Sequence, residues 1–294
     1  MSVSRAALPL SGQTALVTGV SRRRGIGFAV ARAFARLGAS VFIHHYGPHD
    51  QDQPWGADDL SGVVRELRAE LTDGAVLGEK SADLQDTGQI QPLIDAAHAL
   101  TGSLDILVCN HAKSGGDGSI LDMTPEALDA FWTTNTRSTL LLTRAFALLK
   151  ADAPTEAARP GDRVRTDQGP KFTKPTGRVF WMTSGQGHGP MRGEVAYATS
   201  KAALAGVTAT VAAELLELGI VLNTVNPGPV DTGYLSPDAT DRSLDGIQEL
   251  LARQPFGRFG RPNDPANLIS WLATDDGAWI VGQVLTSDGG FYLG

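Results

Sequence analysis

Short apolar runs alternate with longer amphipathic stretches through most of the chain, and this alternation constrains the fold more than any other feature. Two of the runs, Leu104–Cys109 and Val179–Met182, are almost continuously apolar, which is typical of a parallel strand buried on both faces. Apolar runs separated by helix-length segments predict βαβ units. We therefore expect an α/β fold in which helices cover both faces of a doubly wound parallel sheet.

The hydrophobic periodicity places the expected elements along the whole chain. The predicted strands are Thr14–Thr18, Ser40–His44, Ala75–Gly78, Leu104–Cys109, Arg178–Thr183, Ile220–Val225 and Gln283–Thr286. The predicted helices are Ile26–Leu37, Asp58–Leu71, Thr87–Leu100, Thr124–Leu149, Val195–Leu218 and Asp264–Thr274. These elements predict a seven-stranded parallel sheet of the Rossmann type. Because no internal repeat or clean boundary is visible, residues 1–294 are expected to form a single domain.

Two stretches interrupt the alternation. Residues 151–177 are rich in proline and in charges of both signs, so we expect a surface insertion there. Residues 231–257 follow the sixth strand and contain Gly233, Pro237 and a short helical pattern around Ile247–Leu251. Because loops beyond the carboxyl ends of parallel strands line the ligand crevice, this second stretch is a candidate substrate lid.

Composition narrows the class of protein. A chain of 294 residues with 42% hydrophobic residues can bury a sizeable core, and it holds no apolar run long enough for a membrane span. The segment Met1–Leu10 is too weakly apolar for a secretory signal. Cys109 is the only cysteine, which excludes an intrachain disulfide and a cysteine metal cluster, and the net charge of −7 argues against nucleic-acid binding. We expect a soluble cytoplasmic protein that acts on a small molecule without a metal.

A glycine-rich turn joins the first predicted strand to the first predicted helix. Glycines at this place permit a tight turn, and the N-terminus of the following helix offers free N–H groups to an anion. The strand–turn–helix context therefore predicts a site for the diphosphate of a dinucleotide. The expected contacts from this turn are Gly19, Ser21, Arg22, Arg24, Gly25, Ile26 and Gly27.

The turn resembles the fingerprint of the short-chain dehydrogenase/reductase family, Thr-Gly followed after three residues by Gly-x-Gly. In this chain five residues separate Gly19 from Gly25, so the turn is two residues longer. By the same resemblance, Asp83 and Leu84 flank the adenine ring. The family motif Asn-Asn-Ala-Gly corresponds here to Cys109–Ala112, which keeps Asn110 as a cofactor contact and places His111 where the family has alanine. A histidine beside a cofactor is more often packed or hydrogen-bonded than catalytic.

The second predicted strand ends without a carboxylate, at Phe42–Tyr46. An acidic side chain there would bind the adenosine ribose of NAD and repel the 2′-phosphate of NADP. Arginines of the glycine turn could instead pair with that phosphate. NADP(H) is therefore favoured, although NAD(H) remains possible because Asp50 and Asp52 could fold back toward the ribose.

Tyr197 and Lys201 are four residues apart in a predicted helix, and so they share one face of it. A nearby ammonium group favours the phenolate and brings tyrosine, which titrates near pH 10, within reach of proton transfer. Ser184, just after the fifth strand, could steady a substrate oxygen. These three residues and Asn135 match the spacing of the family's catalytic set, in which the asparagine is thought to hold a water that relays protons.

The resemblance extends over nearly the whole chain. It implies that Pro227, Gly228, Val230 and Thr232 contact the nicotinamide end of the cofactor. It also implies a homotetramer and hydride transfer between the cofactor and a carbonyl or alcohol carbon, most like that of 3-oxoacyl-(acyl-carrier-protein) reductases. An NAD-dependent alcohol, sugar or steroid dehydrogenase is an alternative, as is a non-catalytic NADP(H) sensor, which the intact catalytic set disfavours. Met191 and Trp181 could lie in the pocket or the core, with the core preferred for Trp181.

Overall fold

A seven-stranded sheet runs through the middle of the molecule, with all strands parallel and in the order β3-β2-β1-β4-β5-β6-β7. The computed structural model describes residues 8–151, 171–236 and 246–293. The strands are β1 (Thr14–Val17), β2 (Ser40–His45), β3 (Leu77–Ser81), β4 (Ile106–Cys109), β5 (Gly177–Met182), β6 (Ile220–Asn226) and β7 (Val284–Thr286). The order reverses between β1 and β4, and ligands of open α/β sheets bind at such a switch point, beyond the carboxyl ends of the strands.

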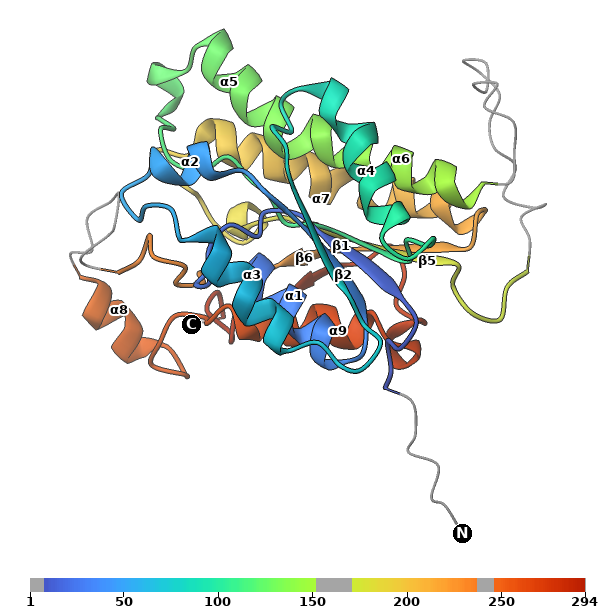
Figure 1. Cartoon of the computed structure of the whole chain (residues 1–294). Coiled ribbons are helices and arrows are strands. Elements are labelled where there is room, and N and C mark those ends of the chain that lie inside the picture. Colours follow the sequence, from blue (N-terminus) through green and yellow to red (C-terminus); the bar gives the residue numbers. More distant parts are fainter. Residues whose placement is uncertain (1–7, 152–170, 237–245, 294) are drawn as a thin grey trace, which may run out of the picture.

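Helices cover both faces of the sheet, which confirms the doubly wound prediction (Figure 1). One face carries α1 (Ile26–Arg36), α3 (Leu60–Ala69) and α9 (Asn263–Leu272). The other carries α4 (Ile90–Ala99), α6 (Ser138–Lys150) and α7 (Val195–Leu216).

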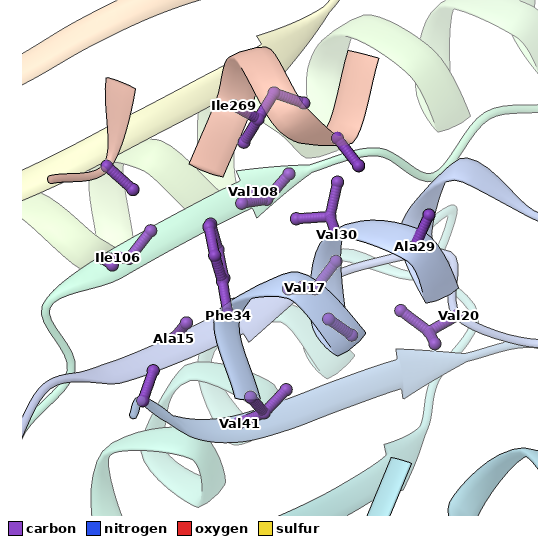
Figure 2. Close-up of a cluster of buried hydrophobic side chains, with 14 of the residues drawn as sticks. Ala15, Val17, Val20, Ala29, Val30, Phe34, Val41, Ile106, Val108 and Ile269 are labelled. Carbon is purple, nitrogen blue, oxygen red and sulfur yellow. The ribbon is translucent and has the colours of Figure 1, made fainter. Parts of the chain in front are cut away.

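The core is divided by the sheet into two apolar clusters, because successive side chains of a strand point to opposite faces. Ala15 and Val17 of β1 belong to the first cluster, whereas Leu16 between them belongs to the second. In the first cluster, Phe34 of α1 lies against the sheet and Ile269 of α9 lies over β4 (Figure 2). Both side chains are fully buried, and burial of a side chain of this size contributes roughly 1.5–3 kcal/mol to folding.

Two predicted elements are wrong in detail. The third strand was expected at Ala75–Gly78 but spans Leu77–Ser81, because it is an edge strand whose last residues are polar and half exposed. The expected helix Thr124–Leu149 consists of α5 (Pro125–Phe131), the π-helical turn η3 (Trp132–Arg137) and α6. Its predicted start is confirmed, since the Thr124 hydroxyl accepts the Ala127 N–H at 3.2 Å.

Shorter elements complete the described chain. They are α2 (Gly47–Gln51), α8 (Ile247–Arg253) and the 3₁₀ turns η1 (Thr87–Gln89), η2 (Ile120–Asp122), η4 (Gly185–Gly187) and η5 (Asp275–Gly277). The sequence predicted α8 but not α2. Most of the expected insertion (152–170 of 151–177) and the middle of the expected lid (237–245 of 231–257) lie outside the described residues.

Candidate active site

A cavity of about 330 Å³ opens at the carboxyl ends of the central strands, and its size falls within the usual range of small-molecule pockets. Most of the residues singled out from the sequence line it. They are Gly19, Ser21, Arg22, Gly25, Ile26, Asp83, Leu84, Asn110, Ser184, Tyr197, Lys201, Pro227, Gly228, Val230 and Thr232. Arg24, Gly27 and Asn135 do not line the cavity.

The glycine turn brings the N-terminus of α1 to the cavity wall. Gly19 has a φ of +71°, and a Cβ on Gly27 would lie 2.5 Å from the Gly19 carbonyl oxygen, so both positions require glycine. Gly25, the N-cap of α1, offers no side-chain cap. The first N–H groups of the helix therefore keep their capacity to bind an anion, and a diphosphate fits this wall.

The three arginines of the turn point in different directions. Arg22 lines the cavity, where its Nε lies 3.1 Å from Asp50 and its Nη1 donates to the Thr232 carbonyl at 2.7 Å. Arg23 faces outward and pairs with carboxylates of α3 and of the loop before it. Arg24 pairs with Asp231 at 3.2 Å, so its prediction as a cofactor contact is not supported.

The structure adds His44 to the cavity wall, a residue that looked like an ordinary strand residue in the sequence. Its Nδ1 accepts the Gly19 N–H at 3.2 Å, and its Nε2 lies 2.9 Å from the Ala82 carbonyl. The ring is therefore neutral with its proton on Nε2. Burial lowers the pKa of His44 to about 4, which keeps this bridge intact at neutral pH.

The short helix α2 brings a carboxylate to the cavity. Asp50 is buried and lines the wall together with His49 and Trp55. The Ser21 hydroxyl and the Arg22 guanidinium both bind Asp50, so its charge is compensated locally. Pro48 near the start of α2 was the one sequence signal for this helix.

Tyr197 and Lys201 lie on one face of α7, as the spacing predicted. The Lys201 Nζ lies 5.7 Å from the centre of the Tyr197 ring and donates to the Met182 carbonyl at 3.0 Å. Burial lowers the pKa of Lys201 to about 8. The ammonium form is thus retained at neutral pH, close to the phenol.

A carboxylate from the loop after β4 holds the N-terminus of α7. Asp117 accepts the N–H of Tyr197 at 2.7 Å and that of Ala196 at 3.1 Å. The neighbouring Gly118 carbonyl accepts the N–H of Val195 at 3.2 Å. Because these N–H groups have no partner inside the helix, Asp117 acts as its cap and fixes the backbone of Tyr197. Asp117 was not predicted from the sequence, because it lies about eighty residues before Tyr197 and no short motif connects the two.

Asn135 lies in η3, fully buried behind the cavity wall. Its side chain accepts the Lys113 N–H at 2.7 Å and donates to the Lys113 carbonyl at 3.2 Å and to the Ser200 hydroxyl at 3.0 Å. Asn135 therefore joins the loop after β4 to α7. Its contact on α7 is Ser200, the residue before Lys201. Both of its amide hydrogens are used by the protein.

Ser184 is the N-cap residue of η4, just after β5, but makes no side-chain cap hydrogen bond, and it lines the same cavity as Tyr197. The next residue, Gly185, is in close contact with Tyr292: a Cβ there would lie 2.0 Å from the Tyr292 hydroxyl, so a larger residue would force the Tyr292 side chain to move. The C-terminal segment thus packs directly against the loop that carries Ser184. Trp181 is fully buried in the core, the position that the sequence analysis preferred for it, whereas Met191 lines the cavity.

Comparison with known proteins identifies the family. A short-chain dehydrogenase/reductase from Serratia marcescens superposes with a TM-score of 0.73 at 26% identity, over 97% of this chain and 99% of its own. A family model described as enoyl-(acyl carrier protein) reductase matches residues 19–155 and 165–292. The chain belongs to the short-chain dehydrogenase/reductase family. It is an oxidoreductase of that family, as the sequence motifs predicted.

Relatives in this family match over nearly their full lengths. An uncharacterized oxidoreductase, YjdA, of Bacillus subtilis is 32% identical over 95% of this chain and 97% of its own. An NADPH-dependent aldehyde reductase-like protein of Arabidopsis thaliana is 31% identical (99% and 98%), and the 3-oxoacyl-[acyl-carrier-protein] reductase FabG of Rickettsia bellii is 31% identical (97% and 99%). A blue fluorescent protein from a metagenomic library, solved in complex with NADPH, has a TM-score of 0.74 at 26% identity (96% and 99%).

Membrane-spanning helices and metal-binding clusters are both absent from the described residues. None of the helices in that part of this family member is both long and apolar enough to cross a bilayer. Within the same residues, no group of three or more histidine, cysteine, aspartate or glutamate side chains is arranged to hold a metal ion.

Proposed function

We propose that the protein uses NADP(H) to interconvert a carbonyl group and a secondary alcohol, as a 3-oxoacyl-type ketoreductase. The observation that carries this proposal is the arrangement of Tyr197 and Lys201 at a cavity that is also lined by the uncapped N-terminus of α1. Tyr197, beside Lys201, can exchange a proton with a substrate oxygen, and the N-terminus of α1 can hold a diphosphate.

The chain's own residues supply orientation and proton transfer. When bound, the nicotinamide supplies or accepts the hydride. The Tyr197 hydroxyl donates its proton to the carbonyl oxygen, which the Ser184 hydroxyl orients. The positive charge of the Lys201 ammonium favours the phenolate form of Tyr197, and the same group would bind the nicotinamide ribose. Asn135 completes the set by holding Lys113 and Ser200 in place.

The proposed cofactor contacts follow the cavity from one end to the other. Asp83 and Leu84 would hold the adenine end, and the segment 227–232 the nicotinamide end; residues of both line the cavity. The diphosphate would be held between them by Gly19, Ser21, Gly25 and Ile26, with Asn110 beside the turn. Gly27 contributes by permitting the close approach of the backbone, and Arg24 is not proposed as a contact.

Several observations support NADP(H) as the cofactor. Arg22 lines the cavity, and β2 ends without a carboxylate. One relative is named as NADPH-dependent, and one structural neighbour was solved with NADPH. The position of Asp50 favours a second candidate, an NAD-dependent alcohol, sugar or steroid dehydrogenase, because its carboxylate reaches the same wall. The pairing of Asp50 with Arg22 and Ser21 weakens that alternative.

The test is a binding titration of NADPH and NADH, followed by a turnover panel. We expect NADPH to bind at least about tenfold more tightly, which corresponds to one good charge-assisted contact. With NADPH present, a 3-oxoester should be reduced faster than an alcohol is oxidised with NAD. A preference for NADH would favour the second candidate, whereas tight binding without any turnover would favour a cofactor sensor.

A homotetramer in the cytoplasm completes the proposal. Large apolar side chains are exposed in the C-terminal part of the chain, where Trp279 is 96% and Trp271 is 45% exposed. Exposed aromatic side chains of this kind mark protein interfaces. Sedimentation velocity of the purified protein would measure the oligomeric state, and a monomer at micromolar concentration would contradict the proposal.

A further inference from the structure

His111 occupies a junction of three elements beside the cavity. It follows β4, is buried and lines the cavity wall. Its Nδ1 lies 2.7 Å from the hydroxyl of Thr18, at the end of β1. Its Nε2 lies 2.7 Å from the hydroxyl of Ser138, at the start of α6, and 3.1 Å from the carbonyl of Thr134, in η3. One ring therefore ties the ends of two central strands to the π-helical turn.

The surrounding hydrogen bonds determine which ring nitrogen carries the proton. The Ser138 hydroxyl donates its hydrogen to the Thr134 carbonyl, so it can only accept from His111. Nε2 is therefore the donor, and Nδ1 of the neutral ring accepts. The single hydrogen of the Thr18 hydroxyl has two acceptors in reach, Nδ1 at 2.7 Å and the Val108 carbonyl at 3.1 Å, and it goes to Nδ1, the nearer of the two. Thr18 in turn accepts the backbone N–H of Asn110 at 2.9 Å and of His111 at 3.2 Å.

His111 does not serve as an acid or base in this setting. Burial lowers the pKa of its imidazole well below the ordinary value, and the positive charge of Lys201 and the nearby His44 act in the same direction. Both nitrogens are occupied by protein groups. The ring stays neutral, and its contribution is geometric.

The turn that His111 holds is the one that carries Asn135. A π-helical turn is rare, usually forms a single turn inside an α-helix, and often occurs at functional sites. Thr134 immediately precedes Asn135, whose side chain reaches Ser200, the neighbour of Lys201. Hydrogen bonds from Thr18 to His111 and from His111 to Thr134, the peptide bond from Thr134 to Asn135, and the hydrogen bond from Asn135 to Ser200 therefore link the end of β1 to the helix of the proposed proton donor.

We propose that His111 is a positioning residue, a neutral Nε2–H donor that fixes η3 so that Asn135 stays bonded to Lys113 and Ser200. The inference rests on the proposed function for its kinetic part only. The family motif that Cys109–Ala112 resembles has alanine where this chain has His111, and an alanine side chain cannot make these bonds.

The test compares His111→Ala with His111→Gln, which keeps an amide donor. We expect His111→Ala to lower kcat for ketone reduction by about tenfold or more, because small misplacements of catalytic groups have effects of this size. The Kd for NADPH should change by less than about threefold. His111→Gln should recover most of the lost kcat, and added imidazole should partly restore His111→Ala, since the vacated space adjoins the cavity.

A second measurement needs no turnover. Hydrogen exchange in peptides covering residues 132–139 should accelerate in His111→Ala, while peptides of α1 should be unchanged. Asn223→Ala serves as the control, because Asn223 is also buried and bridges two segments, through Ile280 at 2.6 Å and Gln283 at 3.0 Å, but lies away from the cavity. It should lower stability without lowering kcat.

The outcomes separate the two levels of inference. Unchanged kcat and unchanged exchange at 132–139 would overturn the positioning role, as would a kcat loss that neither glutamine nor imidazole restores. If His111→Ala does not fold, Ser138→Ala removes the better acceptor of the Nε2–H and should accelerate exchange at the same peptides; no acceleration would overturn the role. If the wild-type protein reduces no carbonyl compound, the proposed function fails, and the exchange experiment still decides the role of His111.

Discussion

Tyr197 and Lys201 share one face of α7, and each changes what the other can do. The phenol is the only group of this pair that can give a proton to a substrate oxygen, because Lys201 points to the Met182 carbonyl from a fully buried position. Replacing Tyr197 by phenylalanine should therefore lower kcat by roughly 10²–10⁴-fold, the usual range for a general acid. NADPH binding, measured by fluorescence titration, should stay close to wild type.

Tyr292→Phe is the matched control for that change. Tyr292 does not line the cavity, although its hydroxyl approaches Gly185. Its loss should leave kcat near wild type. Equal losses in the two variants would indicate that the Tyr197 effect is structural rather than chemical.

The buried position of Lys201 has a consequence for pH dependence. Burial favours the uncharged amine, so the pKa of Lys201 falls to about 8 and the ammonium form is lost above that pH. We expect kcat/KM for ketone reduction to be constant from about pH 6 to pH 7.5 and to fall about tenfold per pH unit above pH 8. A profile that stays flat to pH 10 would contradict this role of the ammonium group.

At the scale of elements, the start of α7 depends on a side chain from another part of the chain. Removing the Asp117 carboxylate leaves the N–H groups of Ala196 and Tyr197 without their acceptor. Asp117→Ala should cost about 1 kcal/mol of unfolding free energy, typical of a lost cap, and should also lower kcat because the Tyr197 backbone moves. Asp117→Asn, which keeps an oxygen acceptor, should lose less unfolding free energy and less kcat than Asp117→Ala.

Asp86 offers the control for this prediction. It caps η1 through the Gly88 N–H at 2.9 Å and does not line the cavity. Asp86→Ala should lower the stability in urea unfolding but not kcat. If Asp117→Ala behaves in the same way, its effect is limited to stability.

The contact between the glycine turn and α1 gives another prediction. A methyl group at Gly27 would meet the Gly19 carbonyl at 2.5 Å and the Asn110 amide at 2.7 Å, so the turn would have to open. Gly27→Ala should therefore weaken NADPH binding by about tenfold or more. Gly206→Ala, on α7 with no atom within 4 Å of the added methyl, should bind NADPH normally and be slightly more stable.

The buried elements were predictable from sequence because their signals are continuous. Strands such as β4 and β5 are apolar along most of their length, and α7 is a long stretch without proline that is rich in alanine, the strongest helix former. The edge strand β3 was misplaced because half-exposed polar residues carry no such signal. The turn η3 was missed because one extra residue per turn barely changes the hydrophobic periodicity.

The site could be predicted only where the chemistry follows a short motif. Ser184, Tyr197, Lys201 and the glycines belong to such motifs, and all but Gly27 line the cavity. Asp117 is missing from the prediction because it reaches α7 from a loop about eighty residues earlier in the chain, whereas Asp50 was considered only as a possible ribose contact. The Arg24 side chain points away from the cavity because it pairs with Asp231, more than two hundred residues later in the chain. A local sequence pattern contains no information about such a pair.

At the scale of the whole molecule, two buried neutral histidines join the central strands. His44 links the glycine turn to the end of β3, and His111 links β1 to η3. Their rings lie 6.1 Å apart, edge to face. In each ring one nitrogen accepts a hydrogen bond, and protonation would remove this acceptor and bury a positive charge. The folded protein should therefore bind these protons weakly and lose stability in acid.

The sign of this effect follows from the direction of the pKa shift. The pKa of His44 is about 4 in the folded protein, against about 6.5 when unfolded, so the unfolded chain binds more protons between these values. The unfolding free energy should therefore be constant above about pH 6.5 and decrease by about 3 kcal/mol toward pH 4 from this residue alone. Urea unfolding at a series of pH values measures it. His44→Gln, which retains a donor and an acceptor but does not titrate, should show a shallower decrease than wild type, whereas parallel curves would contradict the assignment.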